Sequence, residues 1–383
     1  MDAPHYDSSG GDHRMKAVLP RKKFYEAVQV ASRAVTGRSS LPILSNVYIR
    51  GEGEALTLIA TDLEMGIECS IGAKILKEGK VTAPAKVLAE ILSTLPDADV
   101  TIELTDAGAL HITCGSSDYS ILTLPSDEFP LLPEVEGHAR VTLKQGKLRQ
   151  MIRQTIYAVS TDDTRPIMTG MLVIVKDEEM KFVATDTHRL ALKSTKISGA
   201  IGEAYAIVPS RAMNELSRLL GGEDDLPVEI AIAENQVKFC TDHTVLISRL
   251  IEGQFPNFDR VVPKEYQRKW SLQVDTLQDA VRRAAIVARE NANRVVLKTM
   301  DDKLAISSES GSIGKAHEEI DLVREGEELE IAFNARYLLD TINSVDTEGV
   351  LIELQGSLNP GVIKPTEGDD YLCIVMPMQL SGE

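Results

Sequence analysis

The feature that most constrains the fold of this chain is an internal repeat of about 125 residues. The basic residues Lys86, Arg211 and Arg336 are spaced 125 residues apart, and each lies two residues after the Pro or Asn that opens a helix-like segment. This period is several times that of a solenoid repeat, so each unit is expected to be a whole domain with its own core. The sequence therefore predicts one domain fold repeated three times.

Each repeat divides into two similar halves. A short apolar segment leads into an amphipathic helix, and about three strand-like segments with alternating apolar residues follow. The predicted helices are 21–35, 85–95, 147–159, 209–220, 275–288 and 334–345. Segments such as 42–50 in the first half, and 350–354 and 371–377 in the last, are predicted as strands. The fold class is therefore α+β, with each of three domains packing two helices on antiparallel sheets.

The predicted domains are residues 15–138, 139–265 and 266–383, with Pro- and Gly-marked segments between them. Residues 1–14 are polar and are expected to be a disordered extension. No apolar segment approaches the ~20 residues of a membrane span, so no membrane partner is expected.

The cysteines do not form a metal or redox motif. Cys69, Cys114, Cys240 and Cys373 are far apart, and each lies in an apolar strand-like segment. We expect four reduced core thiols in a cytoplasmic protein. The His residues are scattered, and no phosphate-binding loop is present, so no metal and no cofactor are expected.

Charge is unevenly distributed along the chain. The net charge is −17, but the predicted helices with their flanking residues carry +9 and the rest −26. Such a basic helical layer suits a protein whose helices face a polyanion, which they would attract through phosphates without reading base sequence. A simpler explanation is equally open, since Lys and Arg are good helix formers on solvated surfaces.

Helix dimensions distinguish a closed monomer from a closed dimer. Six helices of ~10 Å width in one ring would leave a hole of ~9 Å, whereas twelve would leave ~28 Å. Duplex DNA is roughly 20 Å wide and passes only through the larger hole. A head-to-tail dimer of three-domain chains would close that ring and cover the exposed edge strands.

The strongest enzyme-like feature is Asp186 with His188, because an acid two residues from a base lies on the same face of a strand. The pair Thr61 and Asp62 repeats Thr185 and Asp186 without a His, which favours a turn residue that caps its own backbone. We therefore predict no enzymatic activity. A second alternative is a monomeric scaffold that binds peptides without encircling DNA.

Five motifs occur in an order and spacing that resemble the bacterial DNA polymerase III beta subunit, the sliding clamp, over residues 15–380. They are Gly37-Arg38-Ser39-Ser40-Leu41-Pro42-Ile43-Leu44, Ala60-Thr61-Asp62-Leu63-Glu64-Met65, Ala184-Thr185-Asp186-Thr187-His188-Arg189-Leu190, Gly253-Gln254-Phe255-Pro256 and Met376-Pro377-Met378. The resemblance implies a homodimeric ring that encircles double-stranded DNA and confers processivity on the replicative polymerase. Its implied partners are the polymerase alpha subunit, the clamp loader and other proteins with clamp-binding motifs.

The resemblance also implies site residues. An apolar partner-peptide pocket is expected from Met168, Thr185, Thr187, His188, Arg189, Leu190, Pro256, Arg260, Val261, Ile374, Val375, Met376, Pro377 and Met378. DNA-facing positions are Arg38, Arg165 and Arg211, and the charge count adds Lys22, Lys147, Arg149, Arg153, Arg282 and Arg283. The dimer contact is expected to place Tyr119 and Ile121 against Ile286 and Val287 of the second chain. Gln379, where the family often has Arg, and a loop at 116–118 that is less basic than expected near DNA depart from the family pattern.

Overall fold

The structure is a computed structural model that describes residues 15–36 and 41–380. The chain falls into two compact units. Unit 1 comprises Met1–Gly137 with Val228–Arg249, and unit 2 comprises His138–Pro227 with Leu250–Glu383. The predicted extension 1–14 and the predicted DNA contact Arg38 lie outside the described residues.

The repeated order of one strand, one helix and three strands is confirmed in all six halves. The first repeat contains β1 (Lys16–Pro20), α1 (Arg21–Ser32), β2 (Asn46–Glu52), β3 (Ala55–Thr61), β4 (Met65–Gly72), β6 (Gly79–Pro84), α2 (Ala85–Thr94), β7 (Asp99–Leu104), β8 (Ala109–Cys114) and β9 (Ser117–Leu122). The second contains β10 (Ala139–Lys144), α3 (Gln145–Thr155), β11 (Gly170–Lys176), β12 (Glu179–Thr185), β13 (Arg189–Lys196), β14 (Ala204–Pro209), α4 (Ser210–Leu219), β15 (Pro227–Ile232), β16 (Gln236–Cys240) and β17 (Thr244–Arg249). The third contains β18 (Arg268–Gln273), α5 (Val274–Ala288), β19 (Arg294–Met300), β20 (Lys303–Ser310), β21 (Gly314–Asp321), β23 (Glu330–Asn334), α6 (Ala335–Ile342), β24 (Gly349–Leu354), β25 (Gly361–Pro365) and β26 (Tyr371–Val375).

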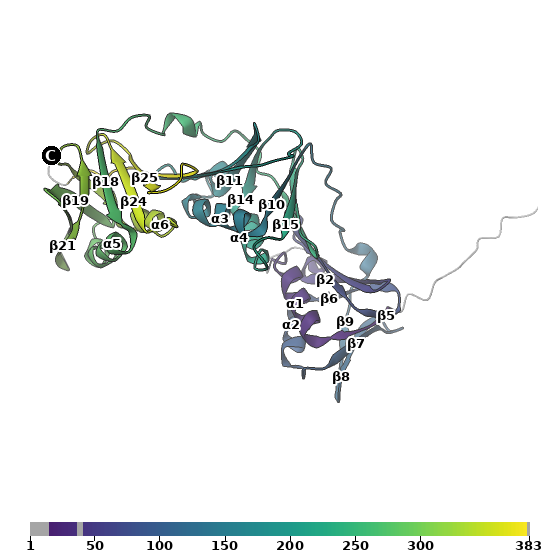
Figure 1. The fold of residues 1–383 in the computed structure, drawn as a ribbon. Coiled ribbons are helices and arrows are strands. Elements are labelled where there is room, and N and C mark those ends of the chain that lie inside the picture. The colour runs from purple at the N-terminus through teal and green to yellow at the C-terminus, as the bar shows by residue number, and fades with distance from the viewer. Residues whose placement is uncertain (1–14, 37–40, 381–383) are drawn as a thin grey trace, which may run out of the picture. The chain divides into compact units, whose positions relative to one another are not determined.

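Local chemistry explains where the helices begin. Pro20, Pro84 and Pro209 end a strand and directly precede α1, α2 and α4. Proline suits this junction because it fixes φ near a helical value and offers no N–H to continue a ladder. Asn334 caps α6 differently, since its side chain accepts hydrogen bonds from the backbone N–H groups of Arg336 and Tyr337. Along the chain the helices pack in successive pairs, α1 with α2, α3 with α4 and α5 with α6 (Figure 1).

Unit 1 contains two antiparallel sheets. One has the order β5-β1-β7-β8-β9, where β5 is Lys74–Lys77, and the other includes β15-β16-β17-β4-β3-β2-β6. The pairing of β17 with β4, from Thr244 opposite Cys69 to Ser248 opposite Met65, joins the first two repeats edge to edge.

Unit 2 joins its repeats in the same way. Its larger sheet has the order β14-β11-β12-β13-β26-β25-β24-β18-β22, where β22 is Val323–Glu325, and the smaller has the order β21-β20-β19-β23. Strand β13 pairs with β26, from Arg189 opposite Val375 to Lys193 opposite Tyr371. This junction brings the central and C-terminal repeats together and forms one wall of an apolar cavity.

The structure corrects three local predictions. Residues Pro42–Ser45 form a 3-10 helix rather than a strand, because Pro42 fixes φ at its first position. Strand β25 was not predicted, since it begins with the turn-forming residue Gly361 and ends with Pro365. Ser117 and Asp118 begin strand β9 rather than lying in a loop, and Asp118 pairs with His111 at 2.8 Å.

Three of the four cysteines are buried, as predicted, whereas Cys240 is only half-buried, and all four are free thiols.

Candidate functional site

An apolar cavity of about 160 Å³ lies in unit 2. Its wall is mostly hydrocarbon, with a few hydroxyl groups and one guanidinium. The lining residues are Met168, Thr185, Thr187, Arg189, Leu190, Pro256, Phe258, Val261, Ile374 and Met376. An open cavity of this composition suits an apolar side chain more than a charged small molecule.

The cavity forms where β13 and β26 meet. Leu190 and Ile374 face each other across the paired strands and belong to a small apolar cluster with Phe255 and Phe258. Just beyond β26, the N–H of Met376 donates to the carbonyl oxygen of His188 at 2.8 Å. Residues from distant parts of the chain thereby share one rim.

A tight turn connects β12 to β13 at the cavity edge. The Asp186 carboxylate accepts hydrogen bonds from the backbone N–H groups of His188 and Arg189 at 2.9 and 3.0 Å. Thr185 Oγ1 donates to the Arg189 carbonyl at 2.7 Å, and Thr187 has φ of 79°. These bonds confirm the prediction that Asp186 caps its own turn.

The equivalent turn in the first repeat has the same geometry. Asp62 accepts from the N–H groups of Glu64 and Met65 at 3.1 and 2.8 Å, and Leu63 has φ of 76°. Because the turn exists without a His, the Thr-Asp pair is explained by backbone capping rather than by acid–base chemistry.

Arg189 makes contacts on several sides, and only 8% of its surface is exposed. Its Nε donates to Asp186 at 3.1 Å and its Nη1 to Asp340 at 2.5 Å. The guanidinium also lies 4.6 Å from the ring centre of Tyr337 and 5.4 Å from that of Tyr157. A buried charge is tolerated only when paired in this way, so Arg189 forms a fixed wall of the cavity.

The structure brings together nine of the fourteen predicted pocket residues in this lining. Five predicted residues, all of them described, do not line the cavity: His188, Arg260, Val375, Pro377 and Met378. Val375 is buried in the core, and the His188 ring stacks on Tyr337 with centres 6.0 Å apart. Phe258 was missed, although it lies only two residues after Pro256.

A buried polar cluster lies behind this wall. Lys193, with a side chain only 4% exposed, pairs with Asp370 at 2.8 Å, and Lys147 approaches the same carboxylate at 3.4 Å. Burial lowers the pKa of Lys193 despite the opposing contact with Asp370. Nearby, the Cys373 thiol lies 2.9 Å from the hydroxyl of Tyr157, and burial raises the Cys373 pKa to about 11.

The predicted DNA-facing residues that the structure describes lie on four α-helices or, in one case, beside a 3-10 helix. Lys22 is exposed on α1, and Arg211 is exposed on α4. Arg165 lies just before the 3-10 helix Pro166–Thr169 and donates to Asp162 at 3.0 Å and to Thr187 at 3.4 Å. The others are on α3 (Lys147, Arg149, Arg153) and on α5 (Arg282, Arg283).

Carboxylates of the same chain neutralise most of the cations on α3 and α5. Arg149 pairs with Asp224 and Arg153 with Asp346, while Arg282 pairs with Asp279 at 2.9 Å and Arg283 with Glu318 at 2.7 Å. The α3 residues line an open cavity of about 580 Å³ together with Lys144, which is not one of the predicted DNA-facing residues. No sequence signal pointed to these acidic partners, because most are distant along the chain.

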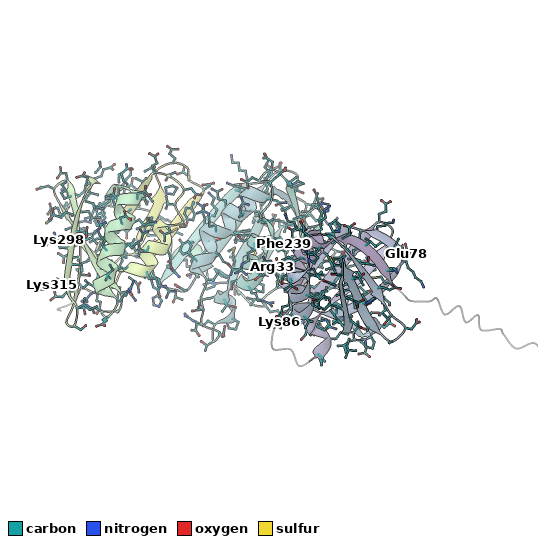
Figure 2. The ribbon with its side chains drawn as sticks, turned by 90° about the horizontal axis from the view of Figure 1, so that it is seen from below. Arg33, Glu78, Lys86, Phe239, Lys298 and Lys315 are labelled. Carbon is teal, nitrogen blue, oxygen red and sulfur yellow. The ribbon has the colours of Figure 1, made fainter. Side chains whose placement is uncertain are left out.

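Two of the four predicted dimer residues are exposed, one in each unit. Tyr119 is 38% exposed on β9, the last strand of its sheet, and Ile121 on the same strand is buried. In unit 2, Ile286 on α5 is 55% exposed and Val287 is half-buried. Strand β21 is the last strand of its sheet, and its Lys315 (labelled in Figure 2) pairs with Glu309 at 2.9 Å.

Within residues 15–36 and 41–380, no group of three or more His, Cys, Asp or Glu side chains is arranged to hold a metal ion. None of the helices in these residues has both the length and the apolar character that a bilayer crossing requires.

Comparisons with known proteins agree along the whole patterned sequence. Family models for the N-terminal, central and C-terminal domains of the DNA polymerase III beta subunit match residues 15–133, 142–257 and 259–379. Curated relatives include the beta sliding clamps of Halalkalibacterium halodurans (33% identity, 95% of this chain, 100% of the relative) and Staphylococcus aureus (32%, 95% and 99%).

The solved sliding clamp of Bacillus subtilis covers 96% of this chain and all of its own with TM-score 0.92 at 30% identity. The DNA polymerase III subunit beta of Pseudomonas aeruginosa gives TM-score 0.91 at 31% identity, with coverage of 96% and 100%. The chain therefore has the three-domain α+β fold of these clamps.

Proposed function

Because the chain belongs to the bacterial DNA polymerase III beta-subunit family, we propose that it is a DNA sliding clamp that confers processivity on the replicative polymerase. One observation carries the proposal. The chain aligns with essentially the full length of relatives named beta sliding clamp, and its three repeats match the three successive domain models of that family. The domain boundaries at 138 and 265 remain a prediction.

The apolar cavity beside Arg189 is the proposed docking site for short peptides of the polymerase alpha subunit, the clamp loader and other clamp-binding proteins. Its Met168 and Met376 are flexible side chains that repack around different apolar groups. The exposed Val261 and Met376 leave the cavity accessible from solvent. A peptide would contribute one or two apolar anchors, while the Arg189 wall stays in place.

Duplex DNA is the proposed polyanion that faces the helices. The contact would be sequence-independent, because it depends on cations that attract phosphates. Two chains are required, since six helices of ~10 Å width enclose too little space for a duplex. The proposed assembly is thus a head-to-tail homodimeric ring.

The proposed subunit contact joins the edge strand β9 of one chain to the edge strand β21 of the other. Both strands end their sheets and offer unpaired backbone groups, which natural proteins seldom leave uncovered. Tyr119 beside one edge and Ile286 on the helix next to the other supply apolar surface for this contact.

In this proposal the protein acts without catalysis, in the cytoplasm. The competing proposal, a monomeric scaffold that binds peptides, shares the cavity but lacks the ring.

Polymerase product length distinguishes the two proposals. The test extends a primed circular template with the replicative polymerase and clamp loader, in an excess of competing unlabelled template so that each product reports one binding event. We expect the chain to lengthen the products at least tenfold. Products of unchanged length, with the polymerase peptide still bound in calorimetry, would favour the monomeric scaffold.

A further inference from the structure

A short acidic loop lies against the first turn of α3. This loop, residues 221–226 between α4 and β15, has the sequence Gly-Gly-Glu-Asp-Asp-Leu. The N–H of Gly146 donates to the Asp224 carbonyl at 3.0 Å, and the N–H of Gln145 donates to the Leu226 carbonyl at 2.8 Å. The loop therefore satisfies backbone donors that the start of a helix leaves free.

Gly146 permits this close approach. A Cβ added at position 146 would lie 2.8 Å from the Cβ and Cγ of Asp224, a distance that real side chains do not reach. The helix thus has a glycine in its first turn, where alanine would favour the helix, at the place where the acidic loop touches it.

The two aspartates of the loop hold two cations of the same surface. Lys144 Nζ contacts Asp225 at 2.7 Å, and Arg149 Nη2 contacts Asp224 while its Nη1 donates to the Leu220 carbonyl at 2.6 Å. The hydrogen bond and charge of Lys144 lower the pKa of Asp225, which favours the ionised carboxylate that Lys144 contacts. Arg149 is consequently occupied on both ends of its guanidinium.

We propose that the carboxylates of this acidic loop compete with DNA phosphates for Lys144 and Arg149. The loop would thereby lower the affinity of the α3 surface for duplex DNA. The inference rests on the proposed function, which places α3 against DNA. A carboxylate offers the same charge-assisted acceptors as a phosphate oxygen, so the two exchange at one cation.

The strength of the pairs sets the size of the effect. Asp225 and Asp224 are 87% and 68% exposed, and such surface ion pairs are weak because water and salt screen them. The loop therefore reduces the affinity for DNA without abolishing it. A ring that must move along DNA benefits from phosphate contacts that break easily.

The test compares the full chain with the variant Asp224→Asn plus Asp225→Asn. Binding to a short fluorescent duplex is measured by anisotropy over a range of salt concentrations. We expect the variant to bind ~3–10-fold more tightly at low salt. The slope of log affinity against log salt concentration should become steeper by about 1–2, because two more cations are free to bind phosphates and release counterions. Gly146→Ala, which leaves every charge in place but pushes the loop away, should shift affinity in the same direction.

Two controls distinguish an effect of the loop on DNA affinity from an effect of the net charge. Asp177→Asn with Glu178→Gln, on the exposed hairpin between β11 and β12, removes the same charge and should change affinity less than twofold. In a chain already carrying Lys144→Gln and Arg149→Gln, the two Asn substitutions should lose their effect, since the cations they release are gone.

Unchanged affinity and salt dependence in the Asp224→Asn, Asp225→Asn variant would overturn the inference. An equal gain in the Asp177→Asn, Glu178→Gln control would overturn it as well, because net charge would then explain the result. The proposed function is judged separately, from whether the unaltered chain is retained on circular DNA.

Discussion

Arg189 stacks on Tyr337, with its guanidinium carbon 4.6 Å from the ring centre. Arg189 begins strand β13 at the cavity, whereas Tyr337 lies on α6 in the following repeat. The same guanidinium donates to Asp340 of α6 at 2.5 Å. The wall of the proposed peptide pocket is therefore fixed to a helix of the next repeat rather than to its own strand alone.

The first prediction is that Arg189→Lys destabilises unit 2 by about 1–3 kcal/mol. Lysine keeps the charge but lacks the planar guanidinium group, which contacts Asp186, Asp340 and the Tyr337 ring at the same time. Urea denaturation followed by the fluorescence of Trp270, the single tryptophan and fully buried in unit 2, measures the change. The control is Arg165→Lys, whose pair with Asp162 is about 40% exposed on both sides, and it should cost under ~0.5 kcal/mol. Equal effects of the two substitutions would contradict the assigned role of Arg189.

The second prediction concerns Met376 at the cavity. Met376→Ala should weaken binding of a polymerase alpha-subunit peptide at least tenfold, or ~1.4 kcal/mol, because the peptide's apolar anchor loses a packing partner. Calorimetry with the isolated peptide measures this affinity. Met300→Ala is the matched control, since Met300 is 37% exposed and Met376 is 36% exposed.

Deletion of 376–383 extends the same test. We expect peptide binding to be lost while light scattering still reports a dimer. If the deleted chain still binds the peptide with undiminished affinity, the cavity is not the peptide-binding site.

The third prediction addresses DNA contact by arginines that the family resemblance singled out. Arg38→Ala with Arg165→Ala should weaken duplex binding and reduce its salt dependence by up to about 2 units of slope. Lys176→Ala with Lys196→Ala, which removes two exposed cations from strands β11 and β13, should leave the slope nearly unchanged. If the two double substitutions change the slope equally, Arg38 and Arg165 contact DNA no more than other exposed cations do.

The fourth prediction is an asymmetry between the two partners of the buried ion pair. Asp370→Asn should cost about 2–4 kcal/mol, because it leaves the buried Lys193 ammonium without its carboxylate. Lys193→Met should stay within about 1 kcal/mol, since it removes a desolvated charge and leaves Asp370, which is 43% exposed, in contact with Lys147. Trp270 fluorescence again reports the denaturation midpoint. A larger cost for Lys193→Met than for Asp370→Asn would refute this description of the cluster.

The same pair gives a pH dependence. Burial would raise the pKa of Asp370, but Lys193 and Lys147 outweigh it and the net pKa is lowered from 3.8. The stabilisation from this carboxylate is therefore complete above its unfolded pKa and is lost as pH falls through the lower folded value. In acid, the stability of Asp370→Asn and of the unaltered chain should converge.

Much of the fold could be predicted from sequence because the signals were local and repeated. Phe24, Val28 and Ala31 are buried on one face of α1, as their helical spacing predicts, whereas Val35 of the same pattern lies beyond the helix. The Pro and Asn residues that precede helices predict the first residue of those helices to within two positions. Strand β25 was missed because its five residues offered too short an apolar pattern between turn residues.

The candidate site depended far less on local pattern. Nothing in the periodicity of the sequence places Met168, Leu190 and Met376 around one cavity, and only the family resemblance suggested it. The carboxylate partners of the helical cations were missed because Arg153 and Asp346, for example, are 193 residues apart. The Arg153–Asp346 contact joins two repeats, and composition and spacing do not determine how those repeats pack.

The proposed ring of two chains around DNA is tested by its retention on closed circles. After treatment with the clamp loader, the complex on circular duplex DNA is isolated, washed in high salt, and then cut once with a restriction enzyme. A two-chain ring should stay on the intact circle and slide off the linear product. Equal retention before and after cutting, or a monomer in light scattering of the same preparation, would contradict it.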